Sequence, residues 1–434
     1  NDPKELEVRA IFKQRSADLA EKLKDPAAAL AVDKAAATTK VADLKAANAP
    51  AAELAAAEKA LTSLPIDAAA AKAAWSRAKA AADVKASPLN GMSPHAQQFK
   101  GDPNGDAAAQ KTYDTSRRNF LALIFCLMVG TAALPHILMR YYTVPSVKEA
   151  RDSVTWSLFF IFLLYFTAPA LAVLVKFEVF TVLIGTPIDQ LPAWVAAWNK
   201  VDPTLLSIVD INKDGILQLN EMSIGGDIVV LATPEIGGLP YVISGLVAAG
   251  GLAAALSTAD GLLLTIANAL SHDLYYKMID PNASTERRVT ISKALLLVVA
   301  LAAATVAAQK PADILFLVSA AFSFAAAAFF PALVMGIFWK RATGIAASLG
   351  MVAGLGTTVY YMVMNQPWLR GIFGITSPID LWYGILPISA GVFGVPVGIA
   401  VIFVVSLITP EPSKKIQDLV DHVRYPNLLG DNRA

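Results

Sequence analysis

Long runs of apolar residues recur along the chain after position 117, separated by short polar connections. A run of about 18 or more apolar residues is a candidate transmembrane helix, because about 20 helical residues cross a hydrocarbon core about 30 Å thick. The pattern predicts seven such helices. They cover residues 118–140, 154–176, 240–271, 289–308, 313–338, 343–364 and 381–408. Residues 177–184 are too short to cross alone and are predicted to extend the second helix along the interface.

The first 117 residues follow a different pattern. Residues 3–86 are rich in alanine with interspersed Lys, Glu and Asp, and Pro26, Pro50 and Pro65 punctuate them. This composition predicts three or four short helices with proline near their starts. Their apolar faces are thin, so a small packed bundle and a flexible charged arm both remain open. Residues 87–106 have the composition of a linker.

These patterns divide the chain into five predicted parts: an extramembrane Ala-rich helical arm with its linker (1–117), two transmembrane helices (118–184), an outer loop (185–239), five transmembrane helices (240–410) and a cytoplasmic tail (411–434). The predicted fold class is therefore all-α, a polytopic transmembrane helical bundle with an extramembrane helical arm.

Composition supports a membrane protein and excludes several other classes. Hydrophobic residues make up 55% of the chain and charged residues only 16%, against about 25% charged in a typical soluble domain. A net charge of +1 offers no basic patch to neutralise phosphates, so no nucleic-acid partner is expected. The single cysteine and four scattered histidines show no metal spacing. The sequence shows no nucleophile paired with a base and no phosphate-binding loop, so we do not expect the protein to be an enzyme.

The connections between the apolar runs differ in positive charge. Lys and Arg favour the cytoplasmic side of a membrane, and twelve of them lie in connections on one side against four on the other. This bias predicts that the C-terminus is cytoplasmic. Residues 1–117 and the loop 185–239 are then outside.

The first predicted helix contains a break signal. Gly130-Thr131 is followed four residues later by Pro135 and then His136. Proline removes a backbone hydrogen bond and glycine loosens a helical turn. At membrane depth, a broken helix is tolerated where it is buried or lines a cavity. The signal therefore fits either a simple kink or an element that lines a binding site.

The third predicted helix carries small and polar residues near its middle. Ala254, Ser257, Thr258 and Gly261 share one face at helical spacing. Such faces usually pack against other helices, but hydroxyls and carbonyls at the membrane midplane can also hold a coupling cation such as Na⁺. Asp260 lies beside them, and an ionisable residue inside a span is a candidate for an ion pathway. Alternatively, Asp260 lies in a water-filled vestibule on the cytoplasmic side.

The outer loop contains a calcium-binding pattern. Residues 210–221 match the twelve-residue EF-hand loop at every specified position, with Gly215 at the sharp turn. Oxygen ligands are predicted from Asp210, Asn212, Asp214, the Ile216 carbonyl, Gln218 and Glu221. Ser207–Val209 and the segment from Met222 onward could form short flanking helices. The alternative is a turn rich in Asp and Asn that binds no ion.

Two stretches resemble the sodium:solute symporter family, in particular its cation/acetate and monocarboxylate branch. The first runs from Gly130 to Val144 and continues with residues 147–151. The second runs from Leu252 to Tyr276 and ends Ser271-His272-Asp273-Leu274-Tyr275-Tyr276. The similarity covers roughly residues 118–410.

The resemblance implies the second half of an inverted-repeat (LeuT-like) transporter fold, with residues 118–184 as core helices six and seven. It implies a sodium site at Ala254, Ser257 and Thr258, counted back from Asp273, and a substrate site near Gly130, Thr131 and His136. Arg140 could belong to that site or anchor the topology. The first repeat, which would complete both sites, is expected in a preceding segment or in another chain.

The predicted function is Na⁺-coupled symport of a small organic acid such as acetate across a bacterial-type inner membrane. The expected partners are that acid, the lipid bilayer and the missing N-terminal half, and the expected ions are Na⁺ and a structural Ca²⁺. H⁺ coupling is left open. The competing hypothesis is a membrane sensor or scaffold subunit that does not transport, motivated by the long outer arm.

Overall fold

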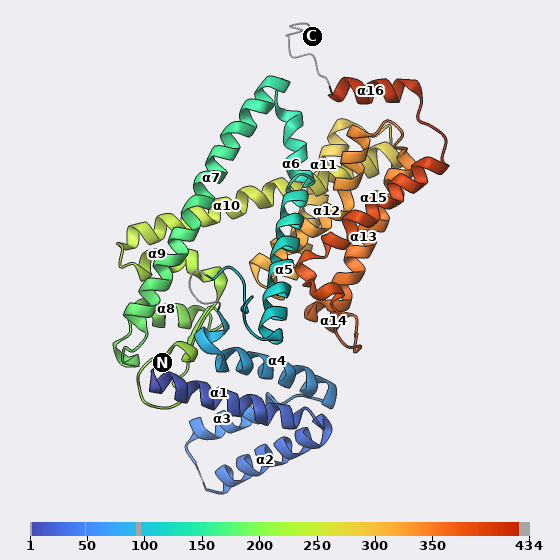
Figure 1. Cartoon of the computed structure of the whole chain (residues 1–434). Coiled ribbons are helices and arrows are strands. Elements are labelled where there is room, and N and C mark those ends of the chain that lie inside the picture. The colour runs from blue at the N-terminus through green and yellow to red at the C-terminus, as the bar shows by residue number, and fades with distance from the viewer. Residues whose placement is uncertain (1, 48, 93–96, 425–434) are drawn as a thin grey trace. The chain divides into compact units, whose positions relative to one another are not determined.

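The computed structural model describes residues 2–47, 49–92 and 97–424. The chain divides into two compact units. The first joins residues 1–98 to residues 172–239, and the second joins residues 99–171 to residues 240–434. Figure 1 labels the α-helices of both units along the chain.

Four helices form the N-terminal part of the first unit: α1 (Pro3–Lys22), α2 (Pro26–Ala46), α3 (Ala51–Thr62) and α4 (Ala68–Ala86). An aspartate caps three of them: Asp2, Asp25 and Asp67 each accept a hydrogen bond from a backbone N–H of the first turn. Proline occupies the start of α1 and α2, where no intrahelical partner for its missing N–H is needed.

These helices pack together. Val8 and Phe12 of α1 are 0% and 7% exposed, and Leu30 of α2 lies in a cluster with Ala71 and Trp75 of α4. The prediction of three or four helices is confirmed. Between the two possibilities left open, the structure favours a packed bundle over a free charged arm.

The other part of the first unit is built from the outer loop. It contains the π-helical turn η3 (Val179–Leu183), the helices α8 (Ala193–Val201) and α9 (Val229–Ile236), the strands β1 (Leu206–Ile208) and β2 (Met222–Ile224), and the short 3₁₀ turns η4 (Ile188–Gln190), η5 (Leu219–Glu221) and η6 (Gly226–Ile228). Val175, Val195, Leu206 and Leu217 share its core.

The prediction of short helices on either side of residues 210–221 is wrong. The flanking segments are the two strands, which pair antiparallel with Ile208 opposite Met222 and Leu206 opposite Ile224. Each segment is only three residues long and ends at a turn, so it cannot repay the cost of starting a helix. Pairing as a ribbon satisfies its backbone groups instead.

The second unit contains most of the apolar helices: α5 (Ala107–Thr131), α6 (Pro135–Leu138), the first part of α7 (Val147–Glu178), α10 (Tyr241–Asn268), α11 (Thr285–Ala308), α12 (Ile314–Phe338), α13 (Gly344–Asn365), α14 (Pro367–Ile372), α15 (Gly391–Ile408) and α16 (Lys414–Arg424). Three 3₁₀ turns complete it: η2 (Met139–Thr143), η8 (Trp382–Gly384) and η9 (Pro387–Ser389).

Within the described residues, seven helices are long and apolar enough to cross a membrane. The predicted all-α polytopic fold is therefore confirmed. α7 continues into η3, and α10 continues as the π-helical segment η7 (Ala269–Ile279). The last span differs from its prediction, because α15 begins at Gly391 and not near 381. Residues 382–389 form two 3₁₀ turns there, the second beginning at Pro387.

Two sets of helices in the second unit differ in how they pack. α12, α13 and α15 form the buried part of the bundle, with α5 against α12. Glycine permits this: a Cβ at Gly354 would lie 2.4 Å from the Ala327 carbonyl oxygen, and a Cβ at Gly394 would lie 2.1 Å from Thr358 Oγ1. By contrast, the apolar windows of α10 and α11 have no buried residues.

Candidate functional site

The first candidate element is the break between α5 and α6. α5 ends at Thr131 and α6 begins at Pro135, so the predicted interruption is confirmed. Ala133 in the break is 0% exposed, and its N–H donates to the Gly130 carbonyl over 2.9 Å. The break is therefore a compact, buried turn.

The three predicted substrate residues have different surroundings. Gly130 is buried where α5 crosses α12, and a Cβ there would lie 2.5 Å from the Phe322 carbonyl oxygen. Thr131 is exposed, and its hydroxyl donates to the Leu127 carbonyl. His136 is half-buried, and its Nδ1 is buried with no hydrogen-bond partner among the described residues. Gly130 thus has a packing role, whereas His136 has an unsatisfied polar atom.

Arg140 follows one turn after His136 and reaches α10. A Cβ built on Gly261 would lie 3.3 Å from Arg140 Nη2. Because glycine has no side chain, it lets the guanidinium approach the helix backbone. Arg140 and Gly261 thus connect the two stretches of sequence that carry the family resemblance.

The predicted sodium ligands lie together on α10. Ala254, Ser257 and Thr258 are all exposed, and the Thr258 hydroxyl donates to the Ala254 carbonyl over 3.1 Å. The hydroxyl and the carbonyl therefore meet on one face. A Cβ added to Gly245 or Gly250, earlier on the helix, would meet no atom within 4 Å. The face is open, and the three predicted ligands supply only part of the coordination shell that a cation needs.

Asp260 is exposed on α10 beside this face. The segment that follows is held against α11. Arg288 lies 4.1 Å from the Tyr276 ring centroid, and the Tyr275 hydroxyl donates to Asp280 over 3.1 Å. The π-helical end of the second resembling stretch is thus anchored by aromatic and charged contacts.

The loop 210–221 has the backbone form that its sequence predicts. Lys213 and Gly215 have φ values of 60° and 74°, so the chain turns sharply at the position where the pattern requires glycine. Residues 215–217 exchange backbone hydrogen bonds with residues 185–188, and Leu217 is 0% exposed. The middle of the loop is therefore fixed to a neighbouring segment.

The side chains of the loop gather on Asp214. Its Oδ2 accepts from Asn212 Nδ2 and Gln218 Nε2, each over 3.1 Å, and lies 3.7 Å from the Lys4 ammonium. The Ile216 N–H donates to the other carboxylate oxygen, Oδ1. This bond is the largest cause that holds the pKa of Asp214 below its usual value, and the Asn212 and Gln218 bonds add to it. Asp210 Oδ1 and Gln218 Oε1 are buried without a partner among the described residues, and Gln218 is 3% exposed.

The carboxylate of Glu221 connects the start and the end of the loop. It accepts hydrogen bonds from the N–H groups of Ile211 (2.7 Å) and Gln218 (3.1 Å). Within the described parts of the chain, no three His, Cys, Asp or Glu side chains lie close enough together to hold a metal. The three acids of the loop are thus held apart, and its remaining oxygens come from amides and a carbonyl.

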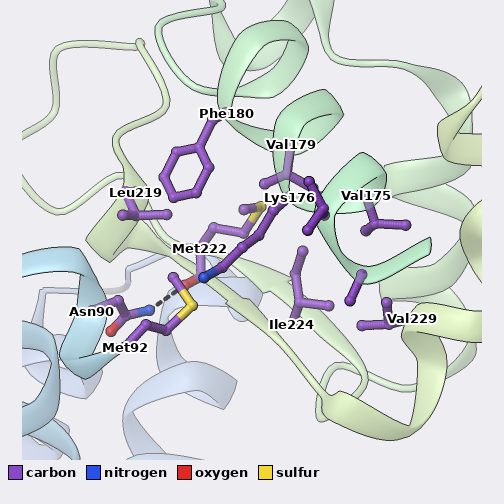
Figure 2. Close-up of a pocket in the computed structure, with 12 residues that line it drawn as sticks. Asn90, Met92, Val175, Lys176, Val179, Phe180, Leu219, Met222, Ile224 and Val229 are labelled. Atoms are coloured by element: carbon purple, nitrogen blue, oxygen red, sulfur yellow. Dashed lines mark hydrogen bonds between the residues drawn. The ribbon is translucent and has the colours of Figure 1, made fainter. Parts of the chain in front are cut away.

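A cavity of about 460 Å³ lies near this loop. Its walls are mostly apolar, and Figure 2 shows Lys176 extending across it toward the hydrogen bond between Asn90 and the Met222 carbonyl. Leu219 and Met222, at the exit of the loop, form one side. The cavity therefore lies between the end of α7, the loop exit and the segment after α4.

Sequence reasoning missed two sets of residues. The approach of Arg140 to Gly261 could not be read from positions 121 residues apart. The contacts of Asn220 and Lys85, which join α4 to the loop exit, carry no local signal either.

Comparisons with known proteins agree with this picture. Residues 231–354, which span most of α9 to the middle of α13, match the sodium:solute symporter family model. An uncharacterized symporter of Cupriavidus necator is 50% identical over 427 residues, which is 98% of this chain and 60% of that protein. A monocarboxylic acid transporter of Corynebacterium glutamicum is 28% identical over 343 residues, covering 75% of this chain and 55% of that protein.

The chain thus spans little more than half the length of the curated relatives it matches. No solved structure matches it. The matched region contains the whole of α10 with its hydroxyl pair and the anchored segment that follows. Because seven helices among the described residues are long and apolar enough to cross a membrane, the chain is a multi-pass membrane protein, and its residues 231–354 match the sodium:solute symporter family model.

Proposed function

We propose that this chain is part of a symporter that couples Na⁺ entry to uptake of a small monocarboxylate such as acetate. Na⁺ is held by the Ala254 carbonyl and the hydroxyls of Ser257 and Thr258, and further ligands come from a segment that packs on the open face of α10. The substrate binds near the α5–α6 break, with Thr131 and His136 beside it and Gly130 supporting the turn.

The observation that carries this proposal is the approach of Arg140 to Gly261. It puts a guanidinium on the same small-residue face of α10 as the hydroxyl pair, about one turn further along. A guanidinium binds a carboxylate through two parallel hydrogen bonds, so the anion and the cation can bind beside one helix. The name of the Corynebacterium glutamicum relative, a monocarboxylic acid transporter, supports this class of substrate.

Coupling follows from this arrangement. A cation that joins α10 to a second segment stabilises the conformation in which both are in contact, and it shifts the equilibrium by its difference in affinity for the two states. Asp260, beside the same face, is proposed to line the ion pathway. In this proposal the protein lies in a bacterial-type inner membrane, with residues 1–117 and the loop outside and the C-terminus cytoplasmic.

The test is uptake of labelled acetate by the full-length protein in liposomes, with an imposed Na⁺ gradient, an H⁺ gradient or neither. We expect uptake that requires the Na⁺ gradient and is lost in the Ser257→Ala/Thr258→Ala double variant. Thr305→Ala is the matched control, because Thr305 is also an exposed helical threonine whose hydroxyl bonds the carbonyl four residues before it.

Three outcomes would overturn parts of this proposal. Uptake that follows H⁺ and ignores Na⁺ would contradict the coupling ion. Equal loss in the Thr305→Ala control would contradict the assignment of the hydroxyl pair. No uptake of any small monocarboxylate under either gradient would favour the sensor or scaffold hypothesis.

We also propose that residues 210–221 bind a calcium ion. Asp214 Oδ2 lies within hydrogen-bond distance of the Asn212 and Gln218 amides, so these three side chains already meet at one point. Turning the Asn212 and Gln218 amides by half a turn presents their oxygens to the same point. Asp210 Oδ1, buried and unpartnered, Glu221 and the Ile216 carbonyl complete the ligands. A dissociation constant of about 10⁻⁴–10⁻³ M is expected for such an extracellular site.

A further inference from the structure

The Ala-rich helices contact one particular part of the outer loop. Both belong to the same compact unit. The Leu219 N–H donates to Glu5 Oε2 of α1 over 3.1 Å, and Lys4 Nζ lies 3.7 Å from Asp214 Oδ2. Asn90, after α4, donates to the Met222 carbonyl over 3.4 Å. Apart from the contact of Lys4 with Asp214, these contacts converge on the exit of residues 210–221.

Asn220 lies at the centre of this contact and is 0% exposed. Its side-chain amide donates to the backbone carbonyls of Lys85 (2.6 Å) and Ser87 (3.2 Å), and its backbone carbonyl accepts from Lys85 Nζ over 3.1 Å. The last carbonyls of a helix have no partner within the helix. Asn220 therefore caps the end of α4 from outside the helix.

Lys85 is held tightly at this point. Its ammonium lies 5.2 Å from the centroid of the Phe12 ring of α1. Burial lowers its pKa, and the nearby charge of Glu221 opposes that shift. A partly desolvated cation placed between α1, α4 and the loop exit is stable only while all three stay in place.

The turn η5 (Leu219–Glu221), together with Gln218, contains two kinds of residue. Gln218 and Glu221 are proposed calcium ligands, whereas Leu219 and Asn220 between them bind the arm. The four residues form one tight turn. Fixing the ligands therefore fixes the residues that bind the arm, and fixing the arm fixes the ligands.

We propose that the Ala-rich arm is the partner of the calcium loop, and that calcium bound at residues 210–221 locks α1 and α4 onto residues 218–222. This rests on the proposed calcium site. Two events that need the same ordered turn favour each other, because the first one bears the entropy cost of ordering it. The coupling is reciprocal, so a docked arm also raises the affinity for calcium.

One observation points to a ligand independently of the sequence pattern. Gln218 is only 3% exposed, its Oε1 has no hydrogen-bond partner among the described residues, and its Nε2 touches Asp214. An unsatisfied buried amide oxygen is costly. Turned by half a turn, the amide presents this oxygen to a cation beside Asp214, and binding that cation removes the cost.

The experiment uses the full-length protein in detergent, which is first treated with a chelator. It is then titrated with CaCl₂ up to about 5 mM, a concentration above the dissociation constant expected for an extracellular site. Calcium binding is measured by calorimetry, and hydrogen exchange is measured for peptides covering residues 3–22 and 68–92. We expect millimolar or tighter binding and exchange of these peptides slowed about tenfold at saturation. MgCl₂ at the same concentration is expected to do neither.

Variants separate the site from its coupling to the arm. Glu221→Gln removes both effects, and Asp210→Asn is the second site variant because Glu221 is completely buried and its replacement can unfold the loop. Asn220→Ala leaves the calcium ligands in place but loses the calcium-dependent protection of α1 and α4, and because the coupling is reciprocal it binds calcium more weakly than the native protein. The matched controls are Glu235→Gln, a carboxylate that accepts from Trp198, and Asn199→Ala, an amide that donates to Leu206, both in the same unit.

The outcomes are distinguishable. If calcium does not bind at the highest concentration, the calcium site and the coupling both fail. If calcium binds but leaves the exchange of α1 and α4 unchanged, only the coupling fails. Neither result bears on acetate uptake, which tests the transport proposal separately.

Discussion

α10 and α13 are both apolar helices with a face of small residues, yet the structure uses the two faces differently. On α13, Gly350 and Gly354 are buried against the backbone of α15 and α12. On α10, Ala254, Ser257 and Thr258 are exposed, and only Arg140 approaches Gly261. The same pattern of small residues thus permits either close packing or an open surface, and the pattern alone does not distinguish them.

The difference has a physical basis. A small-residue face packs where a second helix of this chain can bring its backbone within van der Waals distance. α15 provides that backbone for α13 through Gly394 and Gly398. The small face of α10 carries hydroxyls. Burying a hydroxyl against a methyl group costs free energy, whereas a cation or a polar partner satisfies it. Four variants test this contrast.

The largest effect is expected for Gly354→Leu. A Cβ there meets the Ala327 carbonyl oxygen at 2.4 Å, so the helices must separate, at a cost of about 3 kcal/mol or more. The measurement is the yield of monodisperse protein and its melting temperature. Gly356→Leu is the control, since Gly356 is exposed with no atom within 4 Å of its Cβ position. Equal behaviour of the two variants would contradict the packed role of this face.

Arg140→Gln is expected to raise the KM for acetate by about 10- to 100-fold, because a charge-assisted hydrogen bond contributes about 1.5–3 kcal/mol. Arg140→Lys keeps the charge but loses the two-point geometry, so its KM should fall between those of the native protein and Arg140→Gln. The measurement is uptake at saturating Na⁺. An unchanged KM in both variants would contradict a role of Arg140 in substrate binding and would indicate that it only anchors the topology.

Gly261→Ala is expected to have a moderate effect. The new Cβ lies 3.3 Å from Arg140 Nη2, the far end of a flexible side chain, so the guanidinium moves slightly and the fold is retained. We expect the KM for acetate to rise about threefold, which corresponds to roughly 0.7 kcal/mol. Gly250→Ala, on the open part of the same helix, is the control. A melting temperature lowered in Gly261→Ala alone would indicate packing instead.

The smallest effect on stability is expected for Ser257→Ala/Thr258→Ala. Because both residues are exposed, the change in unfolding free energy should stay within about 0.5 kcal/mol, even though sodium-dependent uptake is lost. Thermal unfolding in detergent without Na⁺ measures this. A destabilisation comparable to that of Gly354→Leu would show that the hydroxyl face is a packing surface like that of α13.

The amount that sequence could predict varied with the distance between the residues concerned. The helices of the arm, the break before Pro135 and the turn at Gly215 depend on neighbours within a few residues, and each of these predictions is confirmed. The strands beside residues 210–221 differ from the helices expected there, because their pairing joins positions 206 and 224 and leaves no periodic signal in three residues. The calcium and sodium ligands stay predictions.

Sequence by itself therefore determined the number of membrane-crossing helices, the position of the break and the spacing of oxygens in residues 210–221. Apolar run length, proline and local spacing act through nearby backbone, so one stretch of chain suffices to read them. Only the tertiary structure decided that the arm packs and binds residues 218–222, that Arg140 lies against Gly261, and that the hydroxyls of α10 are exposed among the described residues. Those features depend on which distant surfaces meet, and that is decided by the packing of the whole chain.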